Sequence, residues 1–258
     1  MIEARNVSKS FAKNKRAVQD VSFMVPKGQI LVLAGLSGCG KTTTLKMINR
    51  LIEMDSGEIR INGINIMEWN PVELRRNIGY AIQETGLLPH LTVGENVGLV
   101  PKLKGWDRAK IDERTHTMLR MVKLIPEAYT ARYPHELSGG QKQRVGVARS
   151  LAADPQIVLM DEPFGALDPV TREELQDEFL LLQSKLKKTI IFITHDIFEA
   201  VRLGDQLAIM NDGCIEQINY PEIILERPAT EFVSKFIGKH RDYLMTYARN
   251  KPLHKDGG

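Results

Sequence analysis

The chain has 258 residues, 43% of them hydrophobic and 26% charged, and its 35 Lys and Arg against 32 Asp and Glu leave a net charge of +3. These values are typical of a globular protein with a substantial core, and they exclude intrinsic disorder as its main state. So small a net charge disfavours a nucleic-acid binder, and no apolar run approaches the roughly 20 residues of a transmembrane helix.

The first third of the chain is predicted to be rich in strands. Alternating apolar residues at 21–25 indicate one strand, and the continuous apolar run at 29–34 indicates a buried one. A glycine-rich loop follows, and apolar residues at helical spacing predict a helix over residues 43–52. Further on, Asn62-Gly63 between alternating isoleucines predicts an antiparallel hairpin.

Helical patterns then replace the strand patterns. Residues 84–154 are predicted to form a helical insertion, with helices over 110–124 and 141–153. Strands and one helix resume after it: we expect strands at 157–160, 189–194, 207–210 and 214–218, and a helix at 171–186. The predicted fold class is therefore α/β, a strand-rich core with a helical insertion.

Residues 35–42 read GLSGCGKT and match the phosphate-binding pattern G-x-x-x-x-G-K-[ST]. Glycines let successive backbone N–H groups turn towards a phosphate chain, and the following helix adds the positive end of its dipole. Lys41 supplies a charge and Thr42 a hydroxyl for Mg²⁺. The alternative, a glycine-rich turn with a solvated lysine, fits the strand and helix context less well. The residues predicted to bind nucleotide here are Gly35, Ser37, Gly38, Cys39, Gly40, Lys41, Thr42 and Thr43.

Polar residues at the ends of predicted strands complete a catalytic prediction. Asp161 and Glu162 end a buried strand, where we expect Asp161 near Mg²⁺ and Glu162 as the general base that polarises water. His195 ends a second parallel strand and is expected at the same sheet edge, against the γ-phosphate. The amide of Gln83 can reach Mg²⁺ or the water. The alternatives are a helix cap for the carboxylates, a surface histidine and an ordinary loop glutamine.

Residues 137–141 read LSGGQ and form a second predicted anion site. Ser138 can cap the helix that follows, and the two glycines expose the N–H groups at its start. A simple capped helix is the alternative. A phosphate loop and a separate anion-binding helix start in one chain suggest two half-sites that a second copy completes, so we predict a dimer.

The order and spacing of these motifs, together with Ala166-Leu167-Asp168, resemble the ATP-binding-cassette (ABC) ATPases over about residues 2–238. The resemblance implies a P-loop NTPase (RecA-like) core with an N-terminal antiparallel β subdomain and an inserted α-helical subdomain. It also implies a head-to-tail dimer that holds two ATP with Mg²⁺. On this resemblance the further nucleotide contacts are Phe11 on adenine, Ser138, Gly139, Gly140 and Gln141 from the other copy, Asp168 across the interface and His195 as the switch.

Residues 80–83, 86–93 and 161–169, with Phe232–Gly238, resemble ATPase subunits of bacterial importers for osmoprotectants such as glycine betaine, choline, carnitine or proline. This implies solute uptake through separate membrane permeases, which Gly86–Val97 would contact. It also implies an extracytoplasmic solute-binding protein and a peripheral place on the cytoplasmic side of the plasma membrane. Alternatives are an ABC ATPase acting on nucleic acid or ribosomes, a transporter ATPase for lipid or another cargo, and a binding-only module.

Two further expectations concern the cysteines and the C-terminal end. Cys39 and Cys214 lie far apart and outside any metal-binding motif, which favours a reducing compartment. Many members of the osmoprotectant subfamily that this chain resembles continue into a regulatory domain, which we do not expect here. Five Lys or Arg against two Asp in residues 239–258 account for the whole net charge. We predict a short basic tail that is disordered, or alternatively lies against anionic lipid.

Overall fold

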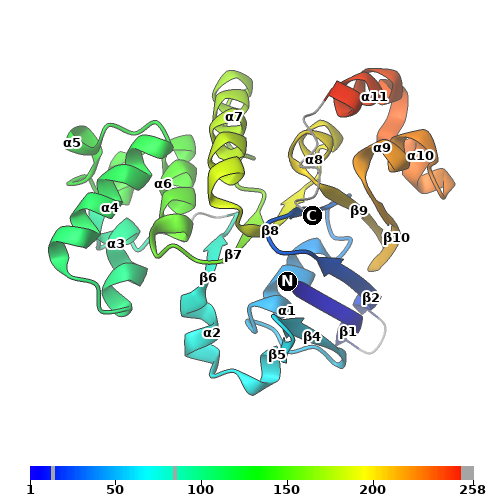
Figure 1. Cartoon of the computed structure of the whole chain (residues 1–258), viewed down its shortest axis with the longest axis horizontal. Coiled ribbons are helices and arrows are strands. Elements are labelled where there is room, and N and C mark those ends of the chain that lie inside the picture. The colour runs from blue at the N-terminus through cyan, green and yellow to red at the C-terminus, as the bar shows by residue number, and fades with distance from the viewer. Residues whose placement is uncertain (13–14, 84–85, 251–258) are drawn as a thin grey trace. The chain divides into compact units, whose positions relative to one another are not determined.

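The computed structural model of the chain describes residues 1–12, 15–83 and 86–250. Residues up to Glu68 and from Thr189 onwards form a first unit, and Trp69–Lys188 form a second. The second unit contains the predicted helical insertion and extends beyond it at each end. Figure 1 labels the elements of the two units, which are described in turn. Among the described residues, no helix has the length and apolar character needed to cross a membrane.

The first unit opens with an antiparallel sheet in the order β2-β1-β4-β5. Its strands are β1 (Ile2–Ala12), β2 (Lys15–Val25), β4 (Ser56–Ile61) and β5 (Ile64–Asn65). The predicted strand at 21–25 is confirmed within the longer β2, and so is the hairpin, whose Gly63 has φ +83°. β5 is only two residues long, because the chain turns at Ile66 into a short 3-10 helix.

The same unit holds a parallel arrangement that carries the phosphate-binding motif. β3 (Ile30–Gly35) lies between β8 (Thr189–Thr194) and β9 (Gln206–Asn211), and β10 (Cys214–Asn219) pairs antiparallel with β9. All six residues of β3 and all six of β8 are buried, which explains their unbroken apolar sequences. α1 (Lys41–Ile48) follows β3 and ends earlier than predicted, and Arg50 just beyond it has φ +49°.

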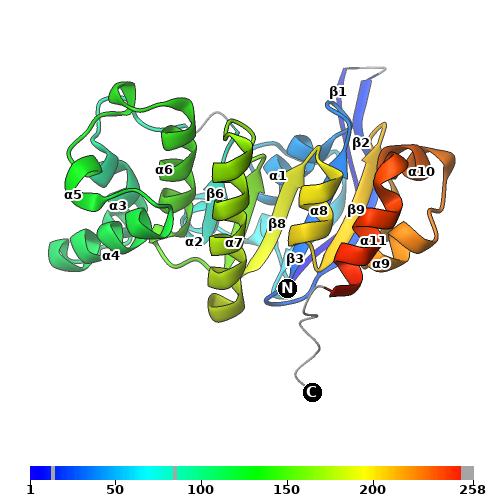
Figure 2. The same ribbon diagram turned by 90° about the horizontal axis from the view of Figure 1, so that it is seen from above.

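The C-terminal end of the first unit is helical, with α8 (Ile197–Leu203), α9 (Pro221–Glu226), α10 (Glu231–Ile237) and α11 (Arg241–Asn250). The prediction of a disordered tail is therefore wrong for residues 241–250. α11 packs against α8 and α9 (Figure 2). Leu244 is buried, and the rings of Tyr243 and Phe198 lie 5.9 Å apart. The apolar spacing of Leu244 and Ala248 was the overlooked helical signal; residues 251–258 lie outside the described part.

The second unit pairs two parallel strands, β6 (Ile78–Ala81) and β7 (Ile157–Asp161), and also holds the helical region of the chain. Its helices are α2 (Pro71–Asn77), α3 (Val93–Leu103), α4 (Arg108–Met121), α5 (Pro126–Tyr129), α6 (Gly139–Ala152) and α7 (Pro169–Leu186). α3 packs against α4 and α6. Gly98 permits this approach, because a Cβ there would lie 2.7 Å from Cγ2 of Ile111.

Candidate functional site

The phosphate loop is shaped by glycines that no other residue can replace. β3 ends at Gly35 and α1 begins at Lys41, as the motif requires. Gly35 and Gly40 have φ values of +153° and +104°, in the region that favours glycine. A Cβ on Gly35 would lie 2.2 Å from the carbonyl oxygen of Met210, and one on Gly40 would lie 2.3 Å from that of Ala17. The loop is therefore pressed against neighbouring backbone on two sides.

Lys41 holds its ammonium group at the centre of this loop. The side chain is buried, with 5% exposure, and its Nζ donates hydrogen bonds to the carbonyl oxygens of Gly35 at 2.7 Å and Leu36 at 2.9 Å. Cys39 Sγ lies 3.7 Å from Nζ in the buried interior of the loop. Ser37 and Gly38 are exposed at its crest. The loop thus combines a fixed positive charge with an accessible backbone surface, which is what a phosphate group binds.

His195 lies at the same sheet edge as the phosphate loop. β3 and β8 pair in parallel with Ala34 opposite Thr194, so Gly35 and His195 follow paired residues. The imidazole is exposed, and Asp196 next to it caps α8 by accepting a hydrogen bond from the Phe198 N–H at 2.8 Å. This position suits a γ-phosphate contact. Glu162 belongs to the second unit, so its expected proximity to His195 stays a prediction.

Phe11, the predicted adenine platform, lies in β1 with 59% of its surface exposed. The ammonium group of Lys9 lies 5.9 Å from the ring centroid, at the outer limit of a cation–π contact. An exposed aromatic face is available for stacking, and the assignment of Phe11 to adenine stays a prediction.

The second unit brings Gln83 and Glu162 together. They follow β6 and β7, which pair with Ala81 opposite Met160, and Nε2 of Gln83 lies 3.5 Å from Oε2 of Glu162. Glu162 has φ +45°, a conformation that costs a non-glycine residue about 1 kcal/mol and is often found at functional sites. Asp161, immediately before it, is 3% exposed. A strained carboxylate and an amide thus meet where β6 and β7 end, and a buried carboxylate directly precedes the strained one in the chain.

The donor set at these positions suits a hard cation. Thr42 in the first unit offers a hydroxyl, and Gln83 and Asp161 in the second offer an amide and a carboxylate oxygen. Within the described residues, no three His, Cys, Asp or Glu side chains gather into a metal cluster. A small number of protein ligands is what Mg²⁺ needs, because the ion keeps several waters and takes its remaining ligands from nucleotide phosphates. The assignment of Mg²⁺ to these three residues stays a prediction.

The LSGGQ segment forms the exposed start of α6. Oγ of Ser138 accepts a hydrogen bond from the Gln141 N–H at 3.3 Å, and Oε1 of Gln141 accepts one from the Ser138 N–H at 3.0 Å. Gln141 also donates to the Tyr129 hydroxyl at 3.0 Å. Its side chain thus stabilises the helix start, a reciprocal cap that the sequence analysis missed. Gly139 has open space where a Cβ would be, so an anion can approach the backbone here.

Asp168 begins the long helix α7. Its carboxylate accepts a hydrogen bond from the Thr171 N–H at 3.0 Å, and this bond lowers the pKa of Asp168 below its ordinary value. The side chain is therefore an ionised helix cap. The role of Asp168 across a dimer interface stays a prediction.

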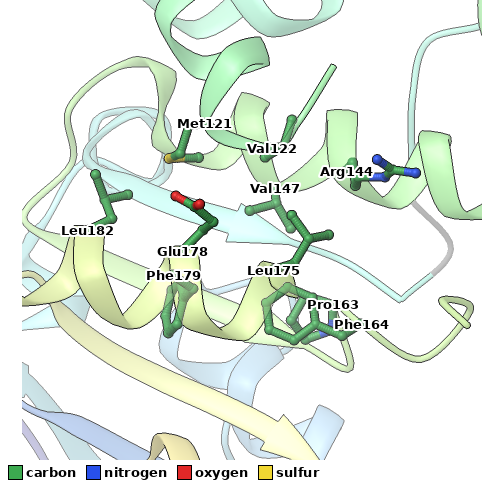
Figure 3. Close-up of a pocket in the computed structure, with 10 residues that line it drawn as sticks. All are labelled: Met121, Val122, Arg144, Val147, Pro163, Phe164, Leu175, Glu178, Phe179 and Leu182. Atoms are coloured by element: carbon green, nitrogen blue, oxygen red, sulfur yellow. The ribbon is translucent and has the colours of Figure 1, made fainter. Parts of the chain in front are cut away.

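A small pocket lies beside the segment that follows Glu162. Figure 3 shows it among side chains of α6, α7, the C-terminal end of α4 and the loop at Pro163 and Phe164. Its volume is about 20 Å³, room for about one water molecule. The rings of Phe164 and Phe179 meet there edge to face, with centroids 6.2 Å apart. The pocket is a gap in an apolar core and offers no space for a nucleotide.

Tyr80 is a polar residue of β6, near Gln83, to which the sequence analysis gave no role at the site. It pairs with Leu159 and so faces the same side of the sheet as Asp161, two residues further along β7. Its hydroxyl is buried and has no hydrogen-bond partner among the described residues. Burial, together with the charge of Asp161, raises the pKa of the phenol. An unsatisfied buried hydroxyl at this position weakens the fold.

Tyr80→Phe is therefore expected to stabilise the protein. Removing the hydroxyl relieves an uncompensated desolvation cost of about 1 kcal/mol, which corresponds to an increase of roughly 3 °C in unfolding temperature. Thermal unfolding followed by circular dichroism measures the shift, with Tyr220→Phe at a half-exposed tyrosine as control. A lower unfolding temperature for Tyr80→Phe would show that an ordered water satisfies the hydroxyl.

Comparison with known proteins adds three findings. The family model described as ABC transporter matches residues 18–165, more than half of the chain. Choline transport ATP-binding protein OpuBA of Bacillus subtilis is 55% identical over 93% of the chain, and the chain spans 63% of OpuBA, less than two thirds. Glycine betaine uptake system ATP-binding protein YehX of Escherichia coli is 52% identical over 93% of the chain and 77% of its own length.

A solved structure agrees with the fold. The ATP-binding cassette MJ0796, in a dimeric post-hydrolysis state bound to ADP and Pi, superposes with a TM-score of 0.80. It is 33% identical to the chain, and the match covers 86% of the chain and 99% of MJ0796. The predicted cassette fold is therefore confirmed, with its antiparallel β part and its helical region.

Proposed function

The chain belongs to the ABC transporter family, and from that premise we propose that it is an Mg²⁺-dependent ATPase subunit that powers uptake of an osmoprotectant through separate membrane permeases. The observation that carries the ATPase proposal is the Gln83–Glu162 pair, 3.5 Å apart beside the buried Asp161. The substrate class rests on relatives named for choline and glycine betaine transport, at 55% and 52% identity. The proposal places the chain at the cytoplasmic face of the membrane, beside the permeases.

The chemistry assigned to the site follows from its side chains. Lys41 and the loop N–H groups bind the β- and γ-phosphates, and His195 contacts the γ-phosphate from the same sheet edge. Glu162 accepts a proton from the attacking water while Gln83 orients that water or the cation. Mg²⁺, held through Thr42 and Asp161, would supply charge neutralisation to the phosphates.

The proposal includes a dimer. The exposed start of α6 at Ser138 and Gly139 presents N–H groups and the positive end of a 14-residue helix. We assign these groups to the γ-phosphate bound by a second copy, or by a different ATPase subunit that takes its place. The similar cassette MJ0796, which is dimeric with ADP and Pi bound, supports a dimer.

A groove in the second unit suits the permease. It lies between α3 and α4, has a volume of about 570 Å³, and includes the apolar side chains of Leu91, Leu99 and Ile111. Positive and negative side chains line it as well, among them Lys102 and Asp112. Part of its lining, from Leu91 to Glu95, belongs to the segment Gly86–Val97 that the family resemblance assigns to permease contact. We assign the groove to a cytoplasmic helix of the permease, which would bury an apolar face there.

Leu99→Arg is expected to weaken permease binding. A long charged side chain would occupy the apolar surface that the permease helix has to bury, so we expect roughly a tenfold loss of permease affinity. Pull-down of detergent-solubilised permease measures it. Leu103→Arg on the same helix is the control, because Leu103 is 51% exposed and does not line the groove. Equal binding by the two variants would place the permease elsewhere.

The experiment that tests the function is reconstitution of the chain with its permease in proteoliposomes. ATP hydrolysis and uptake are measured with glycine betaine, choline, carnitine and proline in turn. We expect at least one of these to raise hydrolysis and to accumulate inside the vesicles. Stimulation by an unrelated cargo would contradict the substrate class, and stimulation by nucleic acid would contradict transport.

A further inference from the structure

The segment that leads from Gln83 to α3 is anchored to that helix by Asn96. This side chain is fully buried, and its Nδ2 donates to the carbonyl oxygens of Leu88 at 3.1 Å, Leu91 at 3.0 Å and Thr92 at 2.9 Å. Its Oδ1 accepts from the Leu88 N–H at 2.8 Å. A buried side chain with all these bonds fixes residues 88–92 to the start of α3.

A second side chain holds the same segment from a different helix. Arg149 of α6 donates from Nη1 to the carbonyl oxygen of Gly86 at 2.7 Å, and burial lowers the pKa of its guanidinium. Gly86 has φ +54°, and a Cβ there would lie 2.3 Å from Cδ1 of Ile82 and 3.6 Å from Nη2 of Arg149. Gly86 therefore lies against the side chain of Ile82, the residue before Gln83, and the hydrogen bond from Arg149 holds Gly86 in this position.

These contacts join three parts of the site through short connections. Ser138 caps the start of α6, and roughly three helical turns, about 16 Å, separate it from Arg149. Gln83, whose amide faces Glu162 at 3.5 Å, follows Ile82 directly in the chain. A displacement of residues 86–92 therefore acts on Gln83 through the backbone and on α6 through Arg149.

We propose that Arg149 is a positioning residue that couples the permease-contact segment to the Gln83–Glu162 pair and to the LSGGQ end of α6. This inference rests on the proposed function, since it needs a permease that moves residues 86–92. Arg149 is proposed to act through the backbone of Gly86, to which it donates a hydrogen bond, and not on the reacting groups themselves. Its guanidinium makes α6 and the Gly86 segment move together, so that permease docking alters the position of Gln83 and of the helix start.

The chain offers a matched control in Arg114. This arginine of α4 donates from Nε to the carbonyl oxygen of Ala152 at 3.0 Å and from Nη2 to that of Leu151 at 2.9 Å. Burial lowers the pKa of its guanidinium too. Arg114 thus makes the same kind of contact with the same helix, at the C-terminal end of α6. Its loss should weaken the fold without releasing Gly86.

The test compares Arg149→Ala, Arg149→Lys and Arg114→Ala in the complete transporter in proteoliposomes. We expect Arg149→Ala to reduce the ratio of solute-stimulated to unstimulated ATP hydrolysis by about tenfold, with less than about a twofold change in KM for ATP. Arg149→Lys should recover part of the ratio, because an ammonium group can donate to Gly86 without the fixed guanidinium geometry. Arg114→Ala should keep the ratio within about twofold.

Hydrogen exchange on the subunit without permease gives a second readout. Arg149→Ala and Arg149→Lys should exchange faster than the unaltered chain at residues 86–92, and Arg114→Ala should not. Unchanged stimulation in folded Arg149→Ala overturns the proposal, and so does an equal loss in Arg114→Ala. If Arg149→Ala does not fold, the stimulation ratio and the hydrogen exchange of Arg149→Lys test the proposal instead, and values equal to those of the unaltered protein overturn it. An unaltered transporter that no osmoprotectant stimulates would contradict the proposed function itself.

Discussion

Glu162→Gln is expected to lower the rate of ATP hydrolysis by about a thousandfold while leaving ATP binding intact. An amide cannot accept the proton of the attacking water, and a general base of this kind contributes roughly 10²–10⁴-fold. Glutamine keeps the size of the side chain, so the turn at φ +45° and the contact with Gln83 persist. We expect the variant to accumulate as an ATP-bound dimer, because the dimer is released by hydrolysis.

Phosphate release measures turnover of Glu162→Gln, and size-exclusion chromatography with ATP measures the dimer. The control is Glu178→Gln on α7. The carboxylate of Glu178 lies 3.4 Å from the ammonium group of Lys123, and we give it no role in catalysis. That variant should turn over at the rate of the unaltered protein. Normal turnover in Glu162→Gln would remove Glu162 from the role of base.

Lys41→Met should weaken ATP binding by about a hundredfold. Its ammonium group is the buried positive charge of the phosphate loop, and hydrogen bonds from a charged donor contribute about 1.5–3 kcal/mol each. A hundredfold change in affinity corresponds to about 2.7 kcal/mol, within the range of one or two such bonds. Methionine has a similar length and no charge, so its side chain still packs inside the loop while the positive charge is lost.

Isothermal titration with ATP measures the dissociation constant of Lys41→Met. Lys46→Met on the same helix α1 is the control, since Lys46 lies in the last turn of that helix and beyond the loop. Its affinity for ATP should change by less than about twofold. An unchanged dissociation constant in Lys41→Met would contradict the assignment of the loop to phosphate.

The elements that the sequence predicted best are those whose burial leaves little choice of residue. β8 was predicted at its observed bounds, because all six of its residues are buried and apolar. The phosphate loop could be recognised because each of its glycines answers a backbone requirement, as the close approach of Gly40 to Ala17 shows. The pairing of Gln83 with Glu162 follows from two parallel strands that end side by side.

Other features had only a weak signal in the local sequence, or none. α3 was missed because Gly94, Gly98 and Pro101 are poor helix formers, and the capping box of Thr92 and Glu95 was the only marker of its start. α11 was hidden by its charged residues. The contact between Arg149 and Gly86 joins residues 63 positions apart, and only the folded chain brings them within hydrogen-bond distance.

The glycines of the phosphate loop limit how this sequence can evolve. At Gly35 and Gly40 the obstacle to a side chain is a carbonyl oxygen of the main chain, at Met210 and Ala17. A substitution at residue 210 or 17 changes a side chain and leaves that oxygen in place. A smaller side chain on the facing strand therefore cannot make room for one at either glycine, and compensation would need a shift of the main chain itself.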